Sequence, residues 1–301
     1  MAVTLALSPV PLHLKRVEAR PFLKWAGGKG QLLPELLARV PIVFGKYFEP
    51  FLGGGALFFA LYSDARVNQA CLSDANAKLM DTYRAVRDEV ESVIAELQGF
   101  AIDKAQYYRV RAWRHDELAP ALRAARFVYL NKTCYNGLYR ENQRGEFNVP
   151  FGRYKRPKIC DADNLRAAAV SLRQAQLECH DFEKILDLAE AGDFAYLDPP
   201  YDPLSPTSSF TSYHEEGFGP NEQHRLARTF QELDRRGVYV MLSNSDTPLT
   251  RALYTAYTVE RVQAARPINS KAQRRGKISE LIVCNYRNKA ESRAVTNREK
   301  V

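Results

Sequence analysis

The sharpest chemical signature in the sequence is the tetrapeptide Asp198-Pro199-Pro200-Tyr201. It directly follows an apolar run ending at Leu197, which predicts a buried strand. Ligands of α/β sheets bind at the edge where the carboxyl ends of the strands lie, and this position puts the tetrapeptide there. Asp198 offers a hydrogen-bond acceptor, the prolines hold the turn rigid, and Tyr201 offers a flat face for stacking. A plain proline turn would explain the first three residues but gives no reason for the tyrosine.

A second signal is the glycine run at residues 53–55, which lies between an expected strand ending at Glu49 and a helical pattern. Glycine has no Cβ, so the backbone can approach a ligand closely there. The spacing is neither G-x-G-x-x-G nor a phosphate-binding GK[ST] loop, and a turn that packs a helix on a sheet explains the glycines equally well. Asp74 favours an adenosine-containing ligand, because an acid at the end of the second strand accepts hydrogen bonds from ribose hydroxyls. Asp74 could instead cap a helix that begins near Ala75.

The excess positive charge is concentrated in one segment. The chain has 43 Lys and Arg against 35 Asp and Glu, a net charge of +8, which favours a polyanionic partner. Residues 132–158 hold two acids and seven basic residues, a net +5 (7 − 2), and the basic ones are Lys132, Arg140, Arg144, Arg153, Lys155, Arg156 and Lys158. Five aromatic residues are interleaved with them: Tyr135, Tyr139, Phe147, Phe151 and Tyr154. A solvated loop would not need these rings, whereas phosphate contacts with stacking or wedging between bases would use them. A second basic run, residues 261–277, either grips phosphates or is an exposed loop.

The strands and helices expected to position these residues alternate along the chain. From Tyr47 onward, short β-rich runs alternate with helical patterns, which predicts an α/β fold with a mostly parallel sheet. We expect seven strands, ending at Glu49, Ser73, Cys179, Leu197, Leu242, Val262 and Tyr286. The second and third strands are separated by far more than one crossover helix, with helical patterns over 75–98 and 104–130. We therefore assign residues 78–162 to a smaller inserted domain and residues 1–77 and 163–301 to a discontinuous main domain.

Several classes of protein are disfavoured. The five cysteines are scattered without a CxxC pair, and the histidines show no HExxH spacing, so we expect no metal site and a reducing, cytoplasmic setting. We expect no signal peptide in the first twenty residues, and no run approaches the ~20 apolar residues of a membrane span.

Asp-Pro-Pro-Tyr resembles the motif of amino-group methyltransferases that act on adenine in DNA. Five further segments resemble those of the Dam-like group (D12 class, alpha group), which methylates adenine in GATC. These segments are PFLKWAGGK at 21–29, EPFLGGGALFF at 49–59, LNKTCYNGLYR at 130–140, GEFNVPFGRYK at 145–155 and SPTSSFTSY at 205–213. The resemblance spans residues 21–286 in that family's order. It implies the class I S-adenosylmethionine-dependent methyltransferase fold, a seven-stranded, mostly parallel sheet, with an inserted, mainly helical DNA-recognition domain.

The resemblance gives the tetrapeptide a catalytic role. The lone pair of adenine's amino group is delocalised into the ring, so the nitrogen is a poor nucleophile. By resemblance, Asp198 and the main-chain carbonyl of Pro199 accept hydrogen bonds from both amino protons, which favours a nitrogen that rehybridises as it takes the methyl group. Tyr201 stacks on the base once it is flipped out of the duplex.

The resemblance also implies two sets of binding residues. Those for S-adenosylmethionine are Trp25, Lys29, Phe51, Gly53, Asp74, Asp181, Phe182 and Asp198. Asp181 would meet the cofactor's adenine amino group, or else cap a helix before Phe182. Those for DNA are Lys24, Tyr135, Asn136, Leu138, Arg140, Pro150 and Tyr154. In the family, the residue matching Lys24 contacts the first guanine and the one matching Arg140 a guanine of the outer pair, as suits basic side chains. Leu138 and Pro150 match contacts to thymine methyl groups, Tyr135 and Asn136 fill or brace the gap left by flipping, and Tyr154 is a further contact.

Other functions fit less well. No cysteine follows a proline, which excludes a cytosine-C5 methyltransferase. N4-cytosine and protein-glutamine enzymes more often carry Ser or Asn before Pro-Pro-Tyr, and a DNA-binding module with a degenerate methyltransferase domain would not need Asp198 and Tyr201 intact. The predicted function is therefore methylation of adenine N6 in duplex DNA, with S-adenosylmethionine as cofactor, S-adenosylhomocysteine as product and no metal. The reaction needs only a monomer. A restriction endonuclease partner, a phage origin and an independent role remain open.

Overall fold

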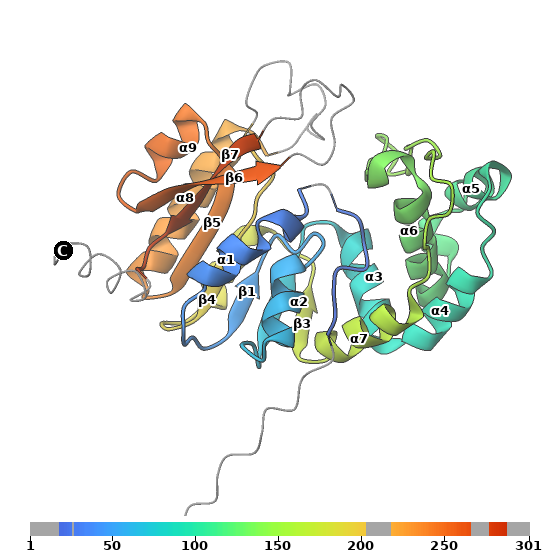
Figure 1. Ribbon diagram of the computed structural model, residues 1–301, viewed down its shortest axis with the longest axis horizontal. Helices are drawn as coiled ribbons and strands as arrows, with labels where there is room; N and C mark the ends of the chain where they lie inside the picture. Colours follow the sequence, from blue (N-terminus) through green and yellow to red (C-terminus); the bar gives the residue numbers. More distant parts are fainter. Residues whose placement is uncertain (1–17, 26, 203–217, 266–276, 288–301) are drawn as a thin grey trace, which may run out of the picture.

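The computed structural model describes residues 18–25, 27–202, 218–265 and 277–287. Within them, one seven-stranded sheet forms the left and centre of the molecule, and a helical insert stands at its right (Figure 1). The strands are β1 (Tyr47–Glu49), β2 (Ala70–Ser73), β3 (Ala175–Glu178), β4 (Phe194–Leu197), β5 (Tyr239–Ser245), β6 (Thr258–Ala265) and β7 (Lys277–Cys284). Their order is β3-β2-β1-β4-β5-β7-β6, and only β7 runs antiparallel to its neighbours. This arrangement confirms the predicted fold class.

The strand order reverses between β1 and β4, which pair side by side. Such a switch point opens a crevice at the carboxyl ends of the strands, where α/β proteins bind ligands. The glycine run follows β1 and the Asp198 turn follows β4, so the fold brings together two segments that lie far apart in the sequence.

Helices cover both faces of the sheet because neighbouring residues of each strand point to opposite sides. Phe194 and Tyr196 of β4 belong to one apolar cluster, whereas Ala195 and Leu197 belong to another. The first cluster includes residues from α1 (Leu33–Arg39), α2 (Ala56–Ser63), α3 (Ala77–Asp88) and α7 (Ala162–Leu172). The second includes residues from α8 (Pro220–Arg235) and α9 (Pro248–Leu253), with a 3-10 turn at Phe182–Asp187. None of the described helices is both long and apolar enough to cross a membrane.

The insert consists of α4 (Val90–Gln98), α5 (Lys104–Arg111), α6 (Pro120–Thr133) and the loops that follow, with 3-10 turns at His115–Glu117 and Tyr135–Gly137. It is mainly helical, as expected, but each of the two long helical patterns is divided. Glu89 leaves helical geometry at φ −133° between α3 and α4, and Pro120 starts α6 anew because proline suits a first helical turn.

The predicted domain boundary at residue 78 falls inside α3, and the one at residue 162 falls at the start of α7. Helix α3 packs against both α6 of the insert and α7 beside the sheet. The first apolar cluster therefore continues from the sheet into the insert, with Phe58 and Val128 both members. The division into two domains stays a prediction.

Four strand ends differ from those predicted. Strand β3 ends at Glu178 instead of Cys179, and β7 ends at Cys284 instead of Tyr286. Strand β6 continues to Ala265, beyond Val262, and β5 continues through Ser243, Asn244 and Ser245. These last three polar residues end the apolar pattern, but they pair with β7 and are buried.

Candidate active site

The centre of the site is a buried ion pair between Asp198 and Lys29. The Nζ of Lys29 lies 2.7 Å from Asp198 Oδ1, and the two side chains are 7% and 17% exposed, Lys29 being the more buried. The hydroxyl of Ser243 donates to the same Oδ1 at 2.8 Å. Burial raises the pKa of Asp198, while the Lys29 ammonium and the Ser243 hydroxyl oppose that shift and favour the ionised carboxylate. The structure thus joins residues predicted from two separate segments.

Two neighbouring acceptors at this turn have no donor among the described residues. Both hydrogen bonds to Asp198 use Oδ1, and the described residues place no donor on Oδ2 or on the carbonyl of Pro199. The next carbonyl, of Pro200, accepts from Gln223 at 3.2 Å. A carboxylate oxygen and an adjacent carbonyl can accept the two hydrogens of one amino group.

The turn is held by residues of three other elements, and the sequence did not identify these residues as part of the site. The hydroxyl of Tyr201 donates to Glu280 of β7 at 2.6 Å, and Asn244 of β5 accepts from the backbone N–H of Asp202 at 3.3 Å. Asn244 in turn donates to Gln223 of α8 at 3.0 Å. The Lys29 ammonium lies 4.5 Å from the centre of the Tyr201 ring, a cation–π contact. The only sequence signal for these supports is the Ser-Asn-Ser that ends the apolar run of β5.

The glycine loop and Asp74 form a second part of the site. Asp74 accepts the backbone N–H of Gly53 at 3.1 Å and that of Asn76 at 2.9 Å. Asn76 caps α3 through its own side chain, so the alternative in which Asp74 caps this helix is wrong. Each carboxylate oxygen keeps a further lone pair, so Asp74 can also accept from a ligand hydroxyl. Burial raises the pKa of Asp74, and the two backbone hydrogen bonds oppose the shift.

Gly53 is required for steric reasons. Its φ is +47°, in the left-handed region, and a Cβ there would lie 2.6 Å from Cδ1 of Trp25. Trp25 itself stacks on Tyr139 of the insert, with ring centres 5.7 Å apart and planes at 28°. The loop is therefore packed too closely against the Trp25 ring for any larger residue.

The remaining predicted cofactor residues form a separate cluster. Phe51 and Phe182 stack with ring centres 5.3 Å apart. A third ring between them would need a separation of roughly 7 Å, twice the contact distance, so a ligand's ring does not fit between these two. Asp181 accepts the N–H of Glu183 at 2.9 Å and pairs with Arg225. It therefore caps the helical turn that begins at Phe182, which was the alternative interpretation of this residue. Its role toward a ligand stays a prediction.

The basic residues of the insert are mostly exposed, but three of the five aromatic residues expected among them are not free to contact bases. Phe147 is buried, and Tyr139 and Phe151 pack against the first apolar cluster, so the core of the insert explains these rings. Gly137, at φ +66°, packs on Lys24, where a Cβ would come 2.7 Å from the lysine's Cβ. The Lys24 ammonium lies 3.8 Å from the centre of the Tyr154 ring. Tyr135 is 43% exposed, Pro150 is also exposed, and Asn136 and Leu138 are partly buried. Arg140 donates through Nε to Asn148 at 2.7 Å, and the described residues leave both Nη atoms without a partner.

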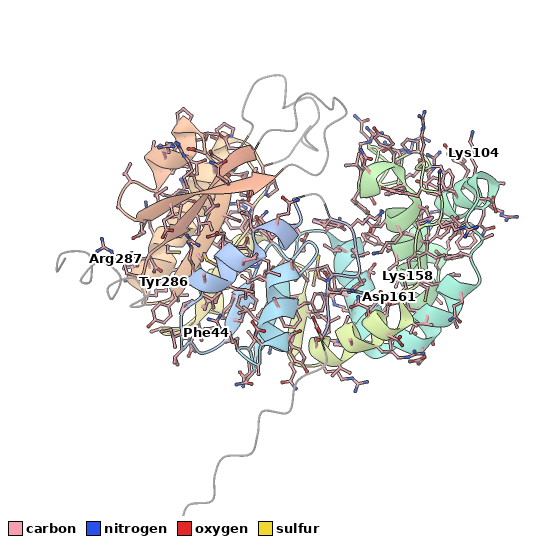
Figure 2. All side chains as sticks on the ribbon, viewed as in Figure 1. Phe44, Lys104, Lys158, Asp161, Tyr286 and Arg287 are labelled. Carbon is pink, nitrogen blue, oxygen red and sulfur yellow. The ribbon has the colours of Figure 1, made fainter. Side chains whose placement is uncertain are left out.

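A basic cavity of about 360 Å³ lies beside Lys24, and it is lined by Lys24, Lys132, Tyr154, Lys155, Arg156, Pro157 and Lys158. Burial and the charge of Lys24 lower the pKa of Lys132 to about 8. Lys158 pairs with Asp161, just before α7 (Nζ to Oδ1 2.8 Å; Figure 2). A cavity whose charged lining is mostly cationic suits an anion such as a phosphate.

Two predicted segments lie partly or wholly outside the described residues. The segment 205–213 is not described, and of the second basic run only residues 261–265 and 277 are. Arg261 pairs with Asp246 at 2.7 Å. The described residues contain no group of three His, Cys, Asp or Glu placed to hold a metal ion.

A reversed strand order, a glycine loop after β1 with an acid after β2, and an Asp-Pro-Pro-Tyr turn after β4 define a class I methyltransferase. The model of the D12 class N6 adenine-specific DNA methyltransferase family matches residues 25–268, and this chain belongs to that family. The enzyme methylates N6 of adenine in DNA, which confirms the predicted reaction.

Relatives cover nearly the whole chain. The type II methyltransferase M1.LlaDCHI of Lactococcus lactis subsp. cremoris is 42% identical, over 92% of this chain and 99% of that protein. The DNA adenine methylase of Serratia marcescens is 38% identical, over 87% and 97%, and that of Escherichia coli K12 is 36% identical, over 87% and 94%. Among solved structures, a putative methylase from Haemophilus influenzae matches with 10% identity and a TM-score of 0.36, over 90% of this chain and 98% of that one.

Proposed function

We propose that this enzyme transfers the methyl group of S-adenosylmethionine to N6 of adenine within GATC in duplex DNA, and that it flips the target adenine out of the duplex. The observation that carries the proposal is a pair of acceptors that no described residue engages, Asp198 Oδ2 and the Pro199 carbonyl, beside the buried Lys29–Asp198 pair. In a base pair, one amino hydrogen of adenine is bound to thymine. A site that accepts both hydrogens therefore needs the base outside the helix.

The residues around the glycine loop fit the cofactor. The absence of a Cβ at Gly53 lets the loop backbone run close to a ligand, and Asp74 can accept from ribose hydroxyls at the loop's edge. Trp25, Phe51 and Phe182 supply apolar surface, Asp181 an acceptor for an adenine amino group, and Lys29 and Asp198 charges of opposite sign. The bound cofactor supplies an electrophilic methyl group on a sulfonium.

The protein's part in the reaction is to activate and orient the amino nitrogen. Lys29 and Ser243 fix Asp198 through Oδ1, which leaves Oδ2 to accept one amino hydrogen while the Pro199 carbonyl accepts the other. These bonds favour a nitrogen lone pair that points out of the ring plane. Positive charge develops on N6 as its bond to carbon forms, and the buried carboxylate stabilises it. As this bond forms, the bond from the methyl carbon to sulfur would break, so that the cofactor would leave as S-adenosylhomocysteine. The methylated amino group would release one proton to solvent.

DNA recognition is proposed for the insert. The Asn148 bond holds Arg140 through Nε, so its two Nη groups form a fork that matches O6 and N7 of a guanine. We assign Lys24 to the other guanine, Leu138 and Pro150 to thymine methyl groups, and Tyr135 and Asn136 to the gap left by flipping. Tyr154, under the Lys24 ammonium, would position that lysine as well as contact DNA.

The test is transfer of labelled methyl from S-adenosylmethionine to matched duplexes with and without GATC, followed by identification of the methylated base. We expect N6-methyladenine only in the GATC duplex. A 2-aminopurine placed at the target adenine should gain fluorescence on binding if the base leaves the stack. Equal labelling of a duplex without GATC would refute the sequence assignment, and N4-methylcytosine would refute the substrate. The relatives include type II methyltransferases, so a neighbouring restriction endonuclease is a proposed partner, tested by expressing the gene found beside this one.

A further inference from the structure

Arg140 stands on a short hairpin formed by residues 140–148. The backbone N–H of Asn148 donates to the Arg140 carbonyl at 3.0 Å, and that of Asn142 donates to the Glu146 carbonyl at 2.9 Å. Glu141 and Phe147 form the antiparallel bridge between these bonds. Since Asn148 on the second arm also holds the Arg140 guanidinium, the position of this side chain follows that of the hairpin.

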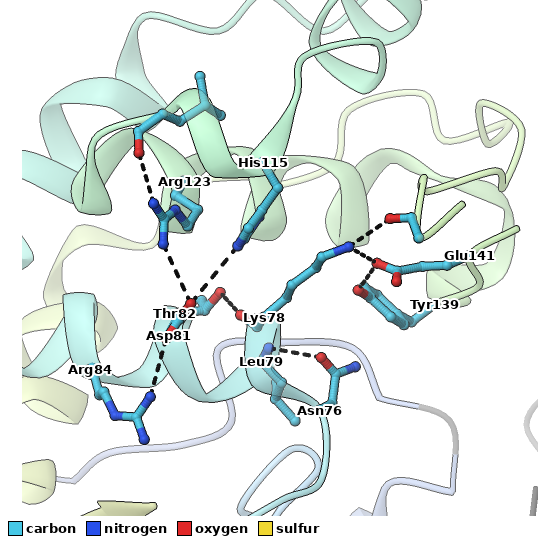
Figure 3. Close-up of polar contacts among 12 residues, drawn as sticks. Asn76, Lys78, Leu79, Asp81, Thr82, Arg84, His115, Arg123, Tyr139 and Glu141 are labelled. Atoms are coloured by element: carbon cyan, nitrogen blue, oxygen red, sulfur yellow. Dashed lines mark hydrogen bonds and ion pairs between the residues drawn. The ribbon is translucent and has the colours of Figure 1, made fainter. Parts of the chain in front are cut away.

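The hairpin is fastened to α3 by one lysine. The Nζ of Lys78 donates to Glu141 Oε1 at 2.7 Å and to the Gly145 carbonyl at 2.6 Å, so it grips both the first arm and the turn. Figure 3 shows Lys78 reaching from α3 to Glu141, which Tyr139 also contacts. The Lys78 and Glu141 side chains are about three-quarters buried, at 24% and 26% exposed. Lys78 lies four residues after Asp74, close to the proposed cofactor site.

Tyr139 links the same carboxylate to the glycine loop. Its hydroxyl donates to Glu141 Oε1, and its ring stacks on Trp25, which packs against Gly53. Burial and the neighbouring Glu141 carboxylate raise the pKa of Tyr139, so this phenol remains a donor at neutral pH. The hairpin is thereby held on one side by α3 and on the other by the aromatic stack over the glycine loop.

We propose that Lys78 is a specificity-determining positioning residue. Through Glu141 it sets the hairpin, and with it Arg140, at a fixed place relative to the Asp198 turn, so that the outer guanine and the target adenine are engaged in one register. The inference rests on the proposed function, in which Arg140 reads guanine. Lys78 acts through these contacts and not as a phosphate ligand, because its ammonium already has a carboxylate and a carbonyl as partners.

The test compares Lys78→Met with Glu141→Met, each of which removes both the charge and the hydrogen-bonding group on one side of the pair while keeping side-chain length. The measurement is kcat/KM on a duplex with the wild type's own methylation site, mapped first, divided by kcat/KM on a duplex altered at one outer base pair. We expect each variant to lower this ratio about tenfold, and the double variant to lower it no further, because contacting residues are not additive.

Glu141→Met is the discriminating variant. It removes a negative charge near the DNA surface, so an effect of charge alone would strengthen binding to every duplex and leave the ratio unchanged. The matched control is Glu91→Met, which breaks the Arg166–Glu91 pair (2.7 and 2.8 Å) between α7 and α4 and should keep the ratio. Thermal unfolding of each variant shows whether it is folded.

The outcomes separate this inference from the proposed function. A wild type that maps to a site other than GATC refutes the proposed sequence, while the ratio is still measured on the mapped site. Ratios that stay at the wild-type value in both variants overturn the positioning role. A uniform decrease on all duplexes for Lys78→Met, with a salt slope about 0.9 shallower and no change for Glu141→Met, would also overturn it and make Lys78 a phosphate contact.

Discussion

Glu49, at the end of β1, tests how strongly burial in the site shifts the pKa of an acidic side chain. Its carboxyl is 3% exposed, and the hydroxyl of Tyr47 donates to it at 2.8 Å. Burial raises its pKa from an ordinary 4.5 to about 8, and the charge of Asp198 contributes, although the Tyr47 hydrogen bond and Lys29 oppose the shift. At neutral pH this carboxyl is therefore protonated in the folded protein.

The consequence is a stability that falls as pH rises. Between pH 4.5 and about 8 the unfolded chain has released the Glu49 proton while the folded protein retains it. Linkage then lowers the free energy of unfolding by about 1.4 kcal/mol per pH unit, or about 5 kcal/mol across the window, and the decrease levels off above pH 8. Glu49→Gln is neutral at every pH and still accepts from Tyr47. We expect it to gain about 5 kcal/mol relative to wild type between pH 4.5 and 8.

The assay is urea unfolding of wild type and Glu49→Gln at several pH values from 4.5 to 9. The quantity is the difference in free energy of unfolding between the two proteins, in which all other titrating groups cancel to first order. A difference that rises with pH up to about 8 supports the argument. A difference that does not change with pH would refute it, because Glu49 would then be ionised in the folded protein.

Three further predictions concern function. Asp198→Ala should abolish methyl transfer while leaving DNA binding by the insert, since it removes an acceptor and leaves Lys29 buried without its partner; near wild-type rates of label transfer would contradict the catalytic role. Replacing Lys155 and Arg156 by Ala should make the log-log dependence of binding on salt shallower by about 0.9 for each phosphate that these side chains neutralise, equally for GATC and random DNA, and an unchanged slope would exclude phosphate contacts. Arg140→Ala should reduce discrimination against single changes at an outer base pair by about 1–3 kcal/mol and spare the central adenine; an equal slowing on all duplexes would mean that Arg140 only neutralises a phosphate.

The sequence was informative where a pattern is local. The apolar runs before Glu49, Ser73 and Leu197 predicted their strands, because strands buried on both faces read as continuous hydrophobic segments. The end of β5 was predicted too early, since Ser243 and Asn244 are buried only because β7 and the Asp198 turn satisfy their polar groups. Such partners lie dozens of residues away in the chain.

The same reasoning explains the site. Lys29 and Asp198 were both identified from motifs, but their contact depends on how the segment before α1 lies against the end of β4, which the motifs alone do not give. Ser243, Glu280 and Glu49 were missed, because their roles arise from contacts across the sheet and from burial. Asp181 was assigned by resemblance, and only the structure shows that its carboxylate is already engaged by Arg225.

Trp25 connects the glycine loop beside the sheet to the helical insert. One side of its ring system excludes any side chain at Gly53 in the glycine loop, and its ring stacks on Tyr139 and Phe127 of the insert. A movement of the glycine loop on cofactor binding must therefore shift the stacked rings as well, since packed rings have little empty space around them. Tyr139 passes the contact to Glu141, beside Arg140. Contacts from Gly53 through Trp25 and Tyr139 to Glu141 are thus continuous. They give the proposed cofactor site a packed connection to the hairpin that carries Arg140, the proposed base-reading residue.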